Sequence, residues 1–175
     1  MTIHPEHPFQ DALSERDPVR RWRGRLGGTV TLWTAGGGEV PRAGLTVSSR
    51  MVATGDPGHA LALLDPDSEF AETLARSRTC VMHLLSWEHL GISDAFAGAS
   101  PAPGGAFRLG DWAESEWGPV LRGVDGWAGL RLVDGDMAVV GWSVLADALI
   151  EHIEIGSETV PLVHRRGRYQ RPAGS

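Results

Sequence analysis

Small hydroxyl side chains are concentrated in one short stretch of the sequence, GLTVSSR at residues 44–50. Thr46, Ser48 and Ser49 alternate there with apolar residues. Their hydroxyls and the neighbouring backbone N–H groups are the short donors that a phosphate or the polar edge of a flat heterocycle requires. The same alternation is also typical of the solvent-facing side of an antiparallel strand. The segment alone leaves both interpretations open, a ligand-binding wall and a plain strand face.

A second set of polar groups follows in LALLDPDSEF, residues 61–70. Asp65 ends an apolar run, and Asp67 or Ser68 can begin a helix that has Glu69 in its first turn. A helix N-terminus offers free N–H groups and a favourable dipole to an anion, so a phosphate could bind beside Ser68. Capping the helix is the commoner use of such a serine, and this interpretation also stays open.

Most of the histidines and the single cysteine predict no metal chemistry. His83 lies in a predicted strand and His89 on a short helix, and neither has the H-x-x-x-H or H-x-E spacing of a metal site. His4 and His7 lie in a proline-rich leader. Cys80 is alone, which excludes a disulfide within the chain and a cysteine metal cluster.

His164 is the histidine with a functional context, because it lies in PLVHRRGRY beside Arg165, Arg166 and Arg168. Guanidinium groups bind phosphate through paired hydrogen bonds, so this basic end could meet a phosphate or a pyrophosphate. The alternative is a solvated basic tail, which requires no ligand.

The composition indicates one globular domain. The chain has 175 residues, 42% of them hydrophobic, with 23 glycines and 11 prolines, which favours many turns over long helices. A formal net charge of -6 argues against nucleic acid or an anionic membrane as the main partner. Without a signal peptide or an apolar run long enough to span a membrane, the chain is expected to be cytoplasmic. We expect a flexible leader at residues 1–16, a domain at 17–170 and a short tail at 171–175.

Capping residues predict a few short helices. The first begins at the Asp-Pro pair of Asp17, the second begins near Ser68 and the third begins at Ser86. The first ends by Gly27 and the third at Gly98, because glycine favours the helix C-terminus. The helices are too short and too few for a strand-helix alternation of the doubly wound type.

Runs of β-branched and apolar residues predict about seven short strands. The clearest span residues 29–35, 43–49, 59–64, 79–85, 126–133 and 137–145. Asp134-Gly135-Asp136 is a typical hairpin turn signal between the last two. No G-x-G-x-x-G or G-x-x-x-x-G-K fingerprint is present, so a nucleotide fold of those types is excluded. The pattern favours a mostly β, antiparallel, barrel-like domain.

Seven motifs of the chain occur in the order typical of one known family. They are GGTVTLWTA, GLTVSS, GDPG, LALLDPDS, CVMHLLS, DAFAG and PLVHRRGRY. In these motifs the chain resembles the flavin reductase-like family, the FMN-binding split barrels, over residues 17–170.

The resemblance implies a six-stranded antiparallel Greek-key split barrel with a few short helices. It also implies a homodimer that binds FMN, or alternatively FAD, in a groove at the dimer interface. On the matching positions, the implied flavin contacts are Thr46, Val47, Ser48, Ser49, Asp65, Ser68, Phe96 and Ala97. His164 and Arg166 are candidates for a flavin phosphate or the pyrophosphate of a nicotinamide dinucleotide. Phe96 could equally be a plain core residue.

The activity implied by the resemblance is an NAD(P)H-dependent flavin reductase, with NADH or NADPH as co-substrate, which could supply reduced flavin to a separate oxygenase. The two cofactors carry the hydride transfer themselves, so no acid-base pair is required of the protein. Met137 stands where family members usually have a histidine that helps to seat the nicotinamide, and Arg50 stands where an aromatic residue is common. These departures motivate an alternative, a flavin-binding carrier, sensor or accessory subunit without reductase activity.

Overall fold

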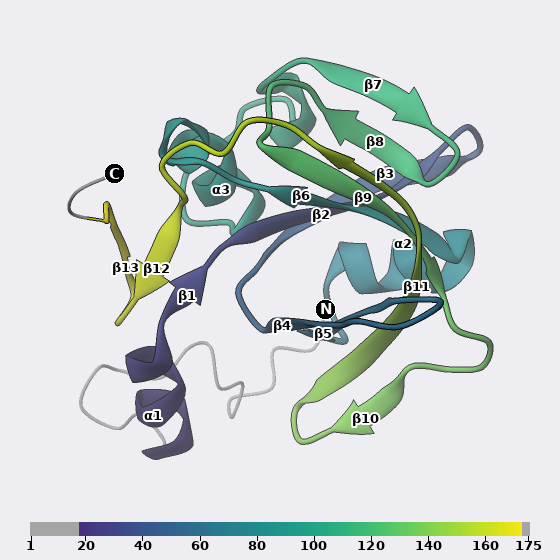
Figure 1. The fold of residues 1–175 in the computed structure, drawn as a ribbon, viewed down its shortest axis with the longest axis horizontal. Helices are drawn as coiled ribbons and strands as arrows, with labels where there is room; N and C mark the ends of the chain where they lie inside the picture. Colours follow the sequence, from purple (N-terminus) through teal and green to yellow (C-terminus); the bar gives the residue numbers. More distant parts are fainter. Residues whose placement is uncertain (1–17, 173–175) are drawn as a thin grey trace.

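One curled antiparallel sheet dominates the fold (Figure 1). The computed structural model describes residues 18–172, so the predicted leader and the Asp17 cap lie outside the described residues. The strands of the sheet, in spatial order, are β3 (Val40–Val47), β2 (Thr31–Gly37), β6 (Thr79–Leu84), β9 (Gly126–Leu132), β11 (Ser143–Ile155), β5 (His59–Leu64) and β4 (Arg50–Ala53), and β10 (Ala138–Val140) pairs with part of β11. This arrangement confirms the predicted mostly β split barrel.

The sheet curls because its two edge strands are consecutive in the chain. β3 and β4 lie at opposite ends of the strand order, yet only Ser48 and Ser49 separate them in sequence. Three hydrogen bonds fix this corner. Ser49 accepts one from the Leu63 N–H at 2.9 Å and donates its hydroxyl to the Leu63 carbonyl at 2.7 Å. Thr31 Oγ1 donates to the Val47 carbonyl at 2.9 Å.

The concave side of the sheet holds the main hydrophobic core. Helix α2 (Glu69–Ser77) lies between β3 and the β4–β5 pair in Figure 1 and buries Phe70, Ala71 and Leu74. Trp33 on β2 meets Phe70 edge to face, with 6.5 Å between the ring centroids. Alanines on β5 and β11 are fully buried and contribute to the same core.

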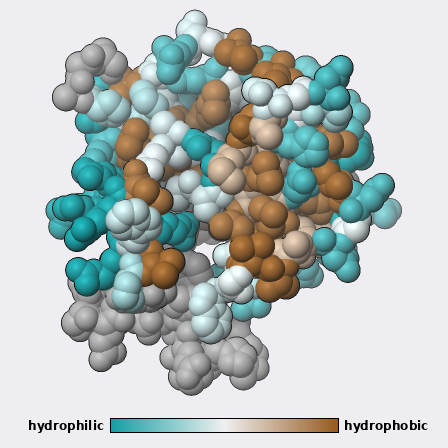
Figure 2. Space-filling model, turned by 60° about the horizontal axis from the view of Figure 1, so that its bottom comes forward, coloured by the Kyte–Doolittle hydropathy of each residue, from teal (hydrophilic) through white to brown (hydrophobic). Residues whose placement is uncertain are grey.

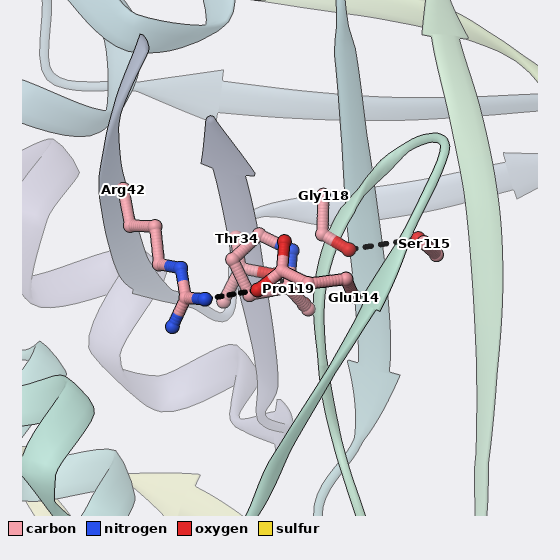
Figure 3. Close-up of polar contacts among 6 residues, drawn as sticks. All are labelled: Thr34, Arg42, Glu114, Ser115, Gly118 and Pro119. Atoms are coloured by element: carbon pink, nitrogen blue, oxygen red, sulfur yellow. Dashed lines mark hydrogen bonds and ion pairs between the residues drawn. The ribbon is translucent and has the colours of Figure 1, made fainter. Parts of the chain in front are cut away.

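The outer side of the sheet carries a second core beneath irregular structure. The covering elements are η1 (Trp87–His89), α3 (Leu90–Phe96), η2 (Ala106–Arg108), β7 (Trp112–Ser115) and β8 (Gly118–Leu121). Figure 3 shows how the β7–β8 hairpin is attached to the main sheet. Thr34 Oγ1 donates to the Pro119 carbonyl at 2.6 Å, and Arg42 forms an ion pair with Glu114. Within the hairpin, Ser115 Oγ donates to the Gly118 carbonyl at 2.7 Å.

A small separate sheet brings the two ends of the described chain together. It consists of β1 (Gly28–Thr29), β12 (Val163–Arg165) and β13 (Arg168–Gln170), and helix α1 (Pro18–Leu26) precedes it. Gly28 pairs with His164, and the Arg166 N–H donates to the Gly24 carbonyl at 2.8 Å. The predicted basic end of the chain therefore lies against α1.

The three predicted helices are present, but some strand predictions are wrong. The Asp134–Asp136 segment does not join paired strands, because β9 pairs with β11 and not with β10. The tight turn lies instead at Gly141, with φ +60, where β10 meets β11. β11 also continues to Ile155, beyond residue 145 where the predicted strand ends. Asp147, within β11, has its carboxylate paired with His59 Nδ1 of β5 at 2.6 Å. The strands β4, β7 and β8 were not predicted, and the main sheet has eight strands among the described residues instead of six.

His83 on β6 links the sheet to the outer layer and has the structural role that the sequence predicts. Its ring is fully buried, with Nδ1 2.9 Å from the Leu32 carbonyl, to which it donates, and Nε2 accepting from the Leu121 N–H at 3.0 Å. Both bonds require the neutral ring, since each nitrogen has one assigned role. Burial lowers the pKa of His83 from 6.5 to about 4.

We expect the free energy of unfolding to fall as the pH is lowered from 6.5 to about 4. In this window the unfolded chain binds a proton at His83 and the folded chain does not, so stability increases with pH and levels off above 6.5. The slope contributed by this residue is at most about 1.4 kcal/mol per pH unit. Urea unfolding at several pH values measures it, and His83→Gln is the reference protein. Equal slopes for the two proteins would contradict the prediction.

Candidate functional site

A groove of about 560 Å³ lies on the convex side of β5 and β11, beside α1 and β12. Its floor is apolar and is formed by Met51, Leu61, Leu63 and Leu145. Its rim is basic and carries Arg20, Arg23, Arg50 and His164. None of the described residues that line it is an aspartate or a glutamate. The groove is therefore suited to a ligand with a flat apolar part and a negatively charged part.

The floor of the groove continues into an exposed hydrophobic face. Figure 2 views the side of the molecule that is lowest in Figure 1, and hydrophobic side chains gather there beside a hollow. Met51 on β4 is 68% exposed, Val140 on β10 is 46% exposed and Trp142 in the following turn is 71% exposed. Leu63 on β5 extends this set, and the strand register places Met51, Leu63 and Val140 on the same face of the sheet. We call these four residues the apolar face. An uncovered set of this kind is typical of an interaction surface.

Three of the residues predicted to contact a ligand line the groove, namely Ser48, Ser49 and His164. The corner between β3 and β4 places both serines there, although the Ser49 hydroxyl already donates to the Leu63 carbonyl. His164 enters from β12 and packs edge to face on Tyr169, with 5.3 Å between the ring centroids. Arg166 is in the following turn, and its side chain is not among those that line the groove.

The other predicted contacts lie elsewhere, and their polar groups have partners within the chain. Thr46 Oγ1 donates to the Ser93 carbonyl at 2.7 Å, and Val47 is in the main core. Ser68 caps α2 by accepting from the Ala71 N–H at 3.2 Å. Asp65 accepts from the Asp67 N–H at 3.0 Å. For Ser68, the structure shows the capping role that the sequence had left open.

Phe96 and Ala97 end helix α3 on the outer side of the sheet. Phe96 is 8% exposed and packs on Phe107 and Trp112, with centroid separations of 4.9 and 5.9 Å. Gly44 on β3 fits beneath the same ring, since a Cβ at that position would come within 2.6 Å of it. Ala97 caps the helix by donating its N–H to the Ser93 carbonyl at 3.0 Å. Neither residue lines the groove.

Sequence reasoning missed α1 as a wall of the groove. The helix has no buried residue, and Arg20 and Arg23 are three positions apart, which places them on one side of it. The sequence shows a basic cluster at residues 20–25, within a predicted helix that ends by Gly27. The i, i+3 spacing of Arg20 and Arg23 in that helix is the signal that could have identified this wall.

The structure shows what surrounds Arg50 and Met137, the two positions that depart from the family pattern. Arg50 is half-buried at the groove and donates from Nη2 to both the carbonyl and the hydroxyl of Thr29, the former at 3.1 Å. Burial lowers its pKa from the ordinary arginine value. Met137 is half-buried and packs against the main core, whereas the groove is lined by other residues.

A metal-binding cluster and a membrane-spanning helix are both absent from the described residues. Within residues 18–172, no cluster of histidine, cysteine, aspartate or glutamate has the size and spacing to bind a metal ion. No helix in the same range combines the length and the hydropathy needed to cross a membrane.

A family model described as flavin reductase like domain matches residues 23–173. The chain belongs to the flavin reductase-like family. The match includes the groove corner at Ser48 and Ser49 and the basic end that carries His164. A search of curated protein sequences found no match.

Solved structures of flavin reductases share the fold of this flavin reductase-like domain. The reductase PheA2 is 21% identical, with a TM-score of 0.77 over 89% of this chain and 97% of its own. BorF, the flavin reductase component of a bacterial two-component tryptophan halogenase, is 18% identical, with a TM-score of 0.75 over 87% and 95%. The NADH:FAD oxidoreductase SgcE6 of Streptomyces globisporus, in complex with NAD and FAD fragments, is 20% identical, with a TM-score of 0.77 over 89% and 91%.

Phe96→Leu is expected to destabilise the domain without weakening flavin binding, because the ring is buried away from the groove. The loss of packing should lower the free energy of unfolding by about 1–2 kcal/mol, and the Kd for FMN should stay within about twofold. Urea unfolding and flavin fluorescence titration measure the two quantities. Gly44→Ala perturbs the same ring from β3 and should behave alike. A large loss of FMN affinity at unchanged stability would instead place Phe96 at the ligand.

Proposed function

We propose that the protein is an NAD(P)H-dependent flavin reductase that binds FMN, or alternatively FAD, in the groove. The observation that carries this proposal is the combination of an apolar floor with a basic rim, with no aspartate or glutamate among the described lining residues. A flavin presents an apolar ring system with a polar edge, and its phosphate supplies the negative charge. Family membership gives the proposal its reaction class.

The chain's own part in this reaction is to bind, orient and exclude water. The side chains of Met51, Leu61 and Leu63 offer apolar contact to one face of a ring. Ser48 and the backbone of the corner offer hydrogen bonds to a polar edge. When both cofactors are bound, the hydride passes between them without a protein group. A groove without an acid-base pair is therefore sufficient for this function.

Turnover is tested by mixing the purified protein with NADH, or with NADPH, and free FMN. We expect nicotinamide absorbance to fall, and the flavin colour to bleach when oxygen is excluded, at rates proportional to protein concentration. FAD in place of FMN determines the flavin preference. Flavin binding without nicotinamide oxidation would reject the reductase activity and leave flavin binding intact.

The second candidate function is flavin binding without reductase activity, as in a carrier, sensor or accessory subunit. The observation that favours it is Met137, which packs on the core at the position where a nicotinamide-seating histidine is usual in the family. A thioether cannot donate the hydrogen bond that a histidine ring donates. Stoichiometric flavin binding with no oxidation of either nicotinamide would select this function.

A homodimer is part of the same proposal. The apolar face shares Met51 and Leu63 with the environment of the groove, so a second copy seated there would cover exposed apolar surface and wall the ligand site at once. Covering such a surface is favourable by roughly 25 cal/mol per Å² of apolar area.

Val140→Lys is expected to weaken dimerisation by at least about tenfold, because it places a charge within the covered surface. Flavin affinity should fall along with the dimer if the partner completes the site. Leu109→Lys is the matched control, since it changes an exposed leucine beside η2, away from the apolar face. Sedimentation equilibrium with and without FMN measures both effects. A dimer of unchanged stability in Val140→Lys would exclude this face as the interface.

A flavin-dependent oxygenase is the proposed acceptor of the reduced flavin. BorF, which shares the fold, is the reductase component of a two-component halogenase, and this supports a similar division of labour here. The proposal also includes a cytoplasmic location and a single functional domain at residues 17–170.

A further inference from the structure

Arg50 is an arginine whose surroundings are not explained by folding alone. Arg42, Arg122 and Arg131 each lie close to a carboxylate, on Glu114, Asp111 and Glu151 respectively. Among the described residues, Arg50 forms no such pair. It is nevertheless half-buried in the wall of the groove, and burial lowers its pKa with no carboxylate acting in the opposite direction. A desolvated cation without a counter-charge is costly unless an anion binds to it.

The side chain is held in place for such an anion. Both of its hydrogen bonds to Thr29 come from one nitrogen, Nη2. A guanidinium has five N–H donors, so those on Nε and Nη1 are left for a ligand. Because Thr29 belongs to β1 and Arg50 begins β4, these bonds also connect the small sheet to the corner of the large one. The donors are therefore positioned before a ligand arrives.

The rest of the rim supports the same chemistry. Arg23 of α1 is exposed and lines the groove, and His164 lies on the same rim. Within residues 18–172 no carboxylate lines the groove, although the whole chain has a formal net charge of -6. A phosphate ester has several acceptor oxygens and matches a guanidinium through paired hydrogen bonds. The neighbouring floor is apolar, so the phosphate belongs to a ligand that also has a flat apolar part.

We propose that Arg50 binds the phosphate of the flavin that occupies the groove, with Arg23 as a second cation and Thr29 as the residue that positions Arg50. This inference rests on the proposed function for the flavin itself, and it adds the residues that recognise the phosphate. The same phosphate chemistry could come from the nicotinamide dinucleotide, and the experiment distinguishes the two sources.

The test compares FMN with riboflavin, which lacks the phosphate. In Arg50→Gln we expect the Kd for FMN to rise by about tenfold or more, with the Kd for riboflavin within about twofold of the parent value. Arg50→Lys keeps the charge without the paired donors and should lie between the two. Thr29→Val removes the hydroxyl that holds Arg50 but keeps the carbonyl bond, so it should raise the Kd for FMN in the same selective manner and by a smaller factor. Fluorescence titration provides the Kd values.

Arg42→Gln is the matched control, because it removes an arginine whose partner is Glu114 at the distant β7–β8 hairpin (Figure 3). It should leave both Kd values unchanged. Thermal unfolding of each variant shows whether the fold is retained, and the riboflavin Kd is a second check on an intact groove.

The outcomes separate the inference from the proposed function. Selective loss of FMN affinity supports Arg50 as the flavin phosphate ligand. Unchanged flavin affinities with about a tenfold higher KM for NADH would overturn the flavin as the source and assign the phosphate to the dinucleotide. Equal losses for FMN and riboflavin, or no change in any quantity, would overturn the role of Arg50. Absence of flavin binding by the parent protein would overturn the proposed function, and competition by inorganic pyrophosphate against a labelled nucleotide would then test the anion site alone.

Discussion

The structure depends on one constraint, the two-residue passage from β3 to β4. Strands at opposite edges of a seven-strand path can be joined by Ser48 and Ser49 only if the sheet curls until its edges meet. The Ser49–Leu63 hydrogen bonds fix that meeting point. The concave core around α2 and the convex groove on β5 both follow from this curvature. The corner therefore belongs to the fold and to the candidate site at the same time.

Different parts of the same sheet consequently have different tasks. The interior is filled by Trp33, Phe70 and small alanines, and the outer side of β2 and β6 is sealed by a second core in which His83 satisfies two backbone groups. The convex side of β4, β5 and β11 carries the candidate groove and the apolar face. Its apolar floor and basic rim contrast with the acidic character of the whole chain. This local reversal of charge concentrates an anionic ligand at one place.

The proposed function would require little chemistry from the protein. Flavin and nicotinamide would exchange a hydride by their own reactivity, so the tasks left to the groove would be position, charge and exclusion of water. An arginine held by Thr29 and serines held at a strand corner are suited to these tasks, because their partners fix them before a ligand binds. Because such a reaction would need no acid-base group of the protein, the sequence is not expected to show a titratable pair at the groove.

The sequence by itself determined the family, the mostly β class and the positions of the helices among the described residues, since these depend on local pattern and on ordered motifs. It could not determine which hydroxyls remain available. The resemblance implies Thr46 and Ser68 as flavin contacts, and only the tertiary structure shows their oxygens bonded to Ser93 and Ala71. Nor could the sequence reveal that α1 and Arg50 line one groove, or that β11 continues to Ile155, because pairing between distant segments decides both. Hydrogen-bond partners and charge neighbours come from the folded arrangement, and residue type alone does not contain them.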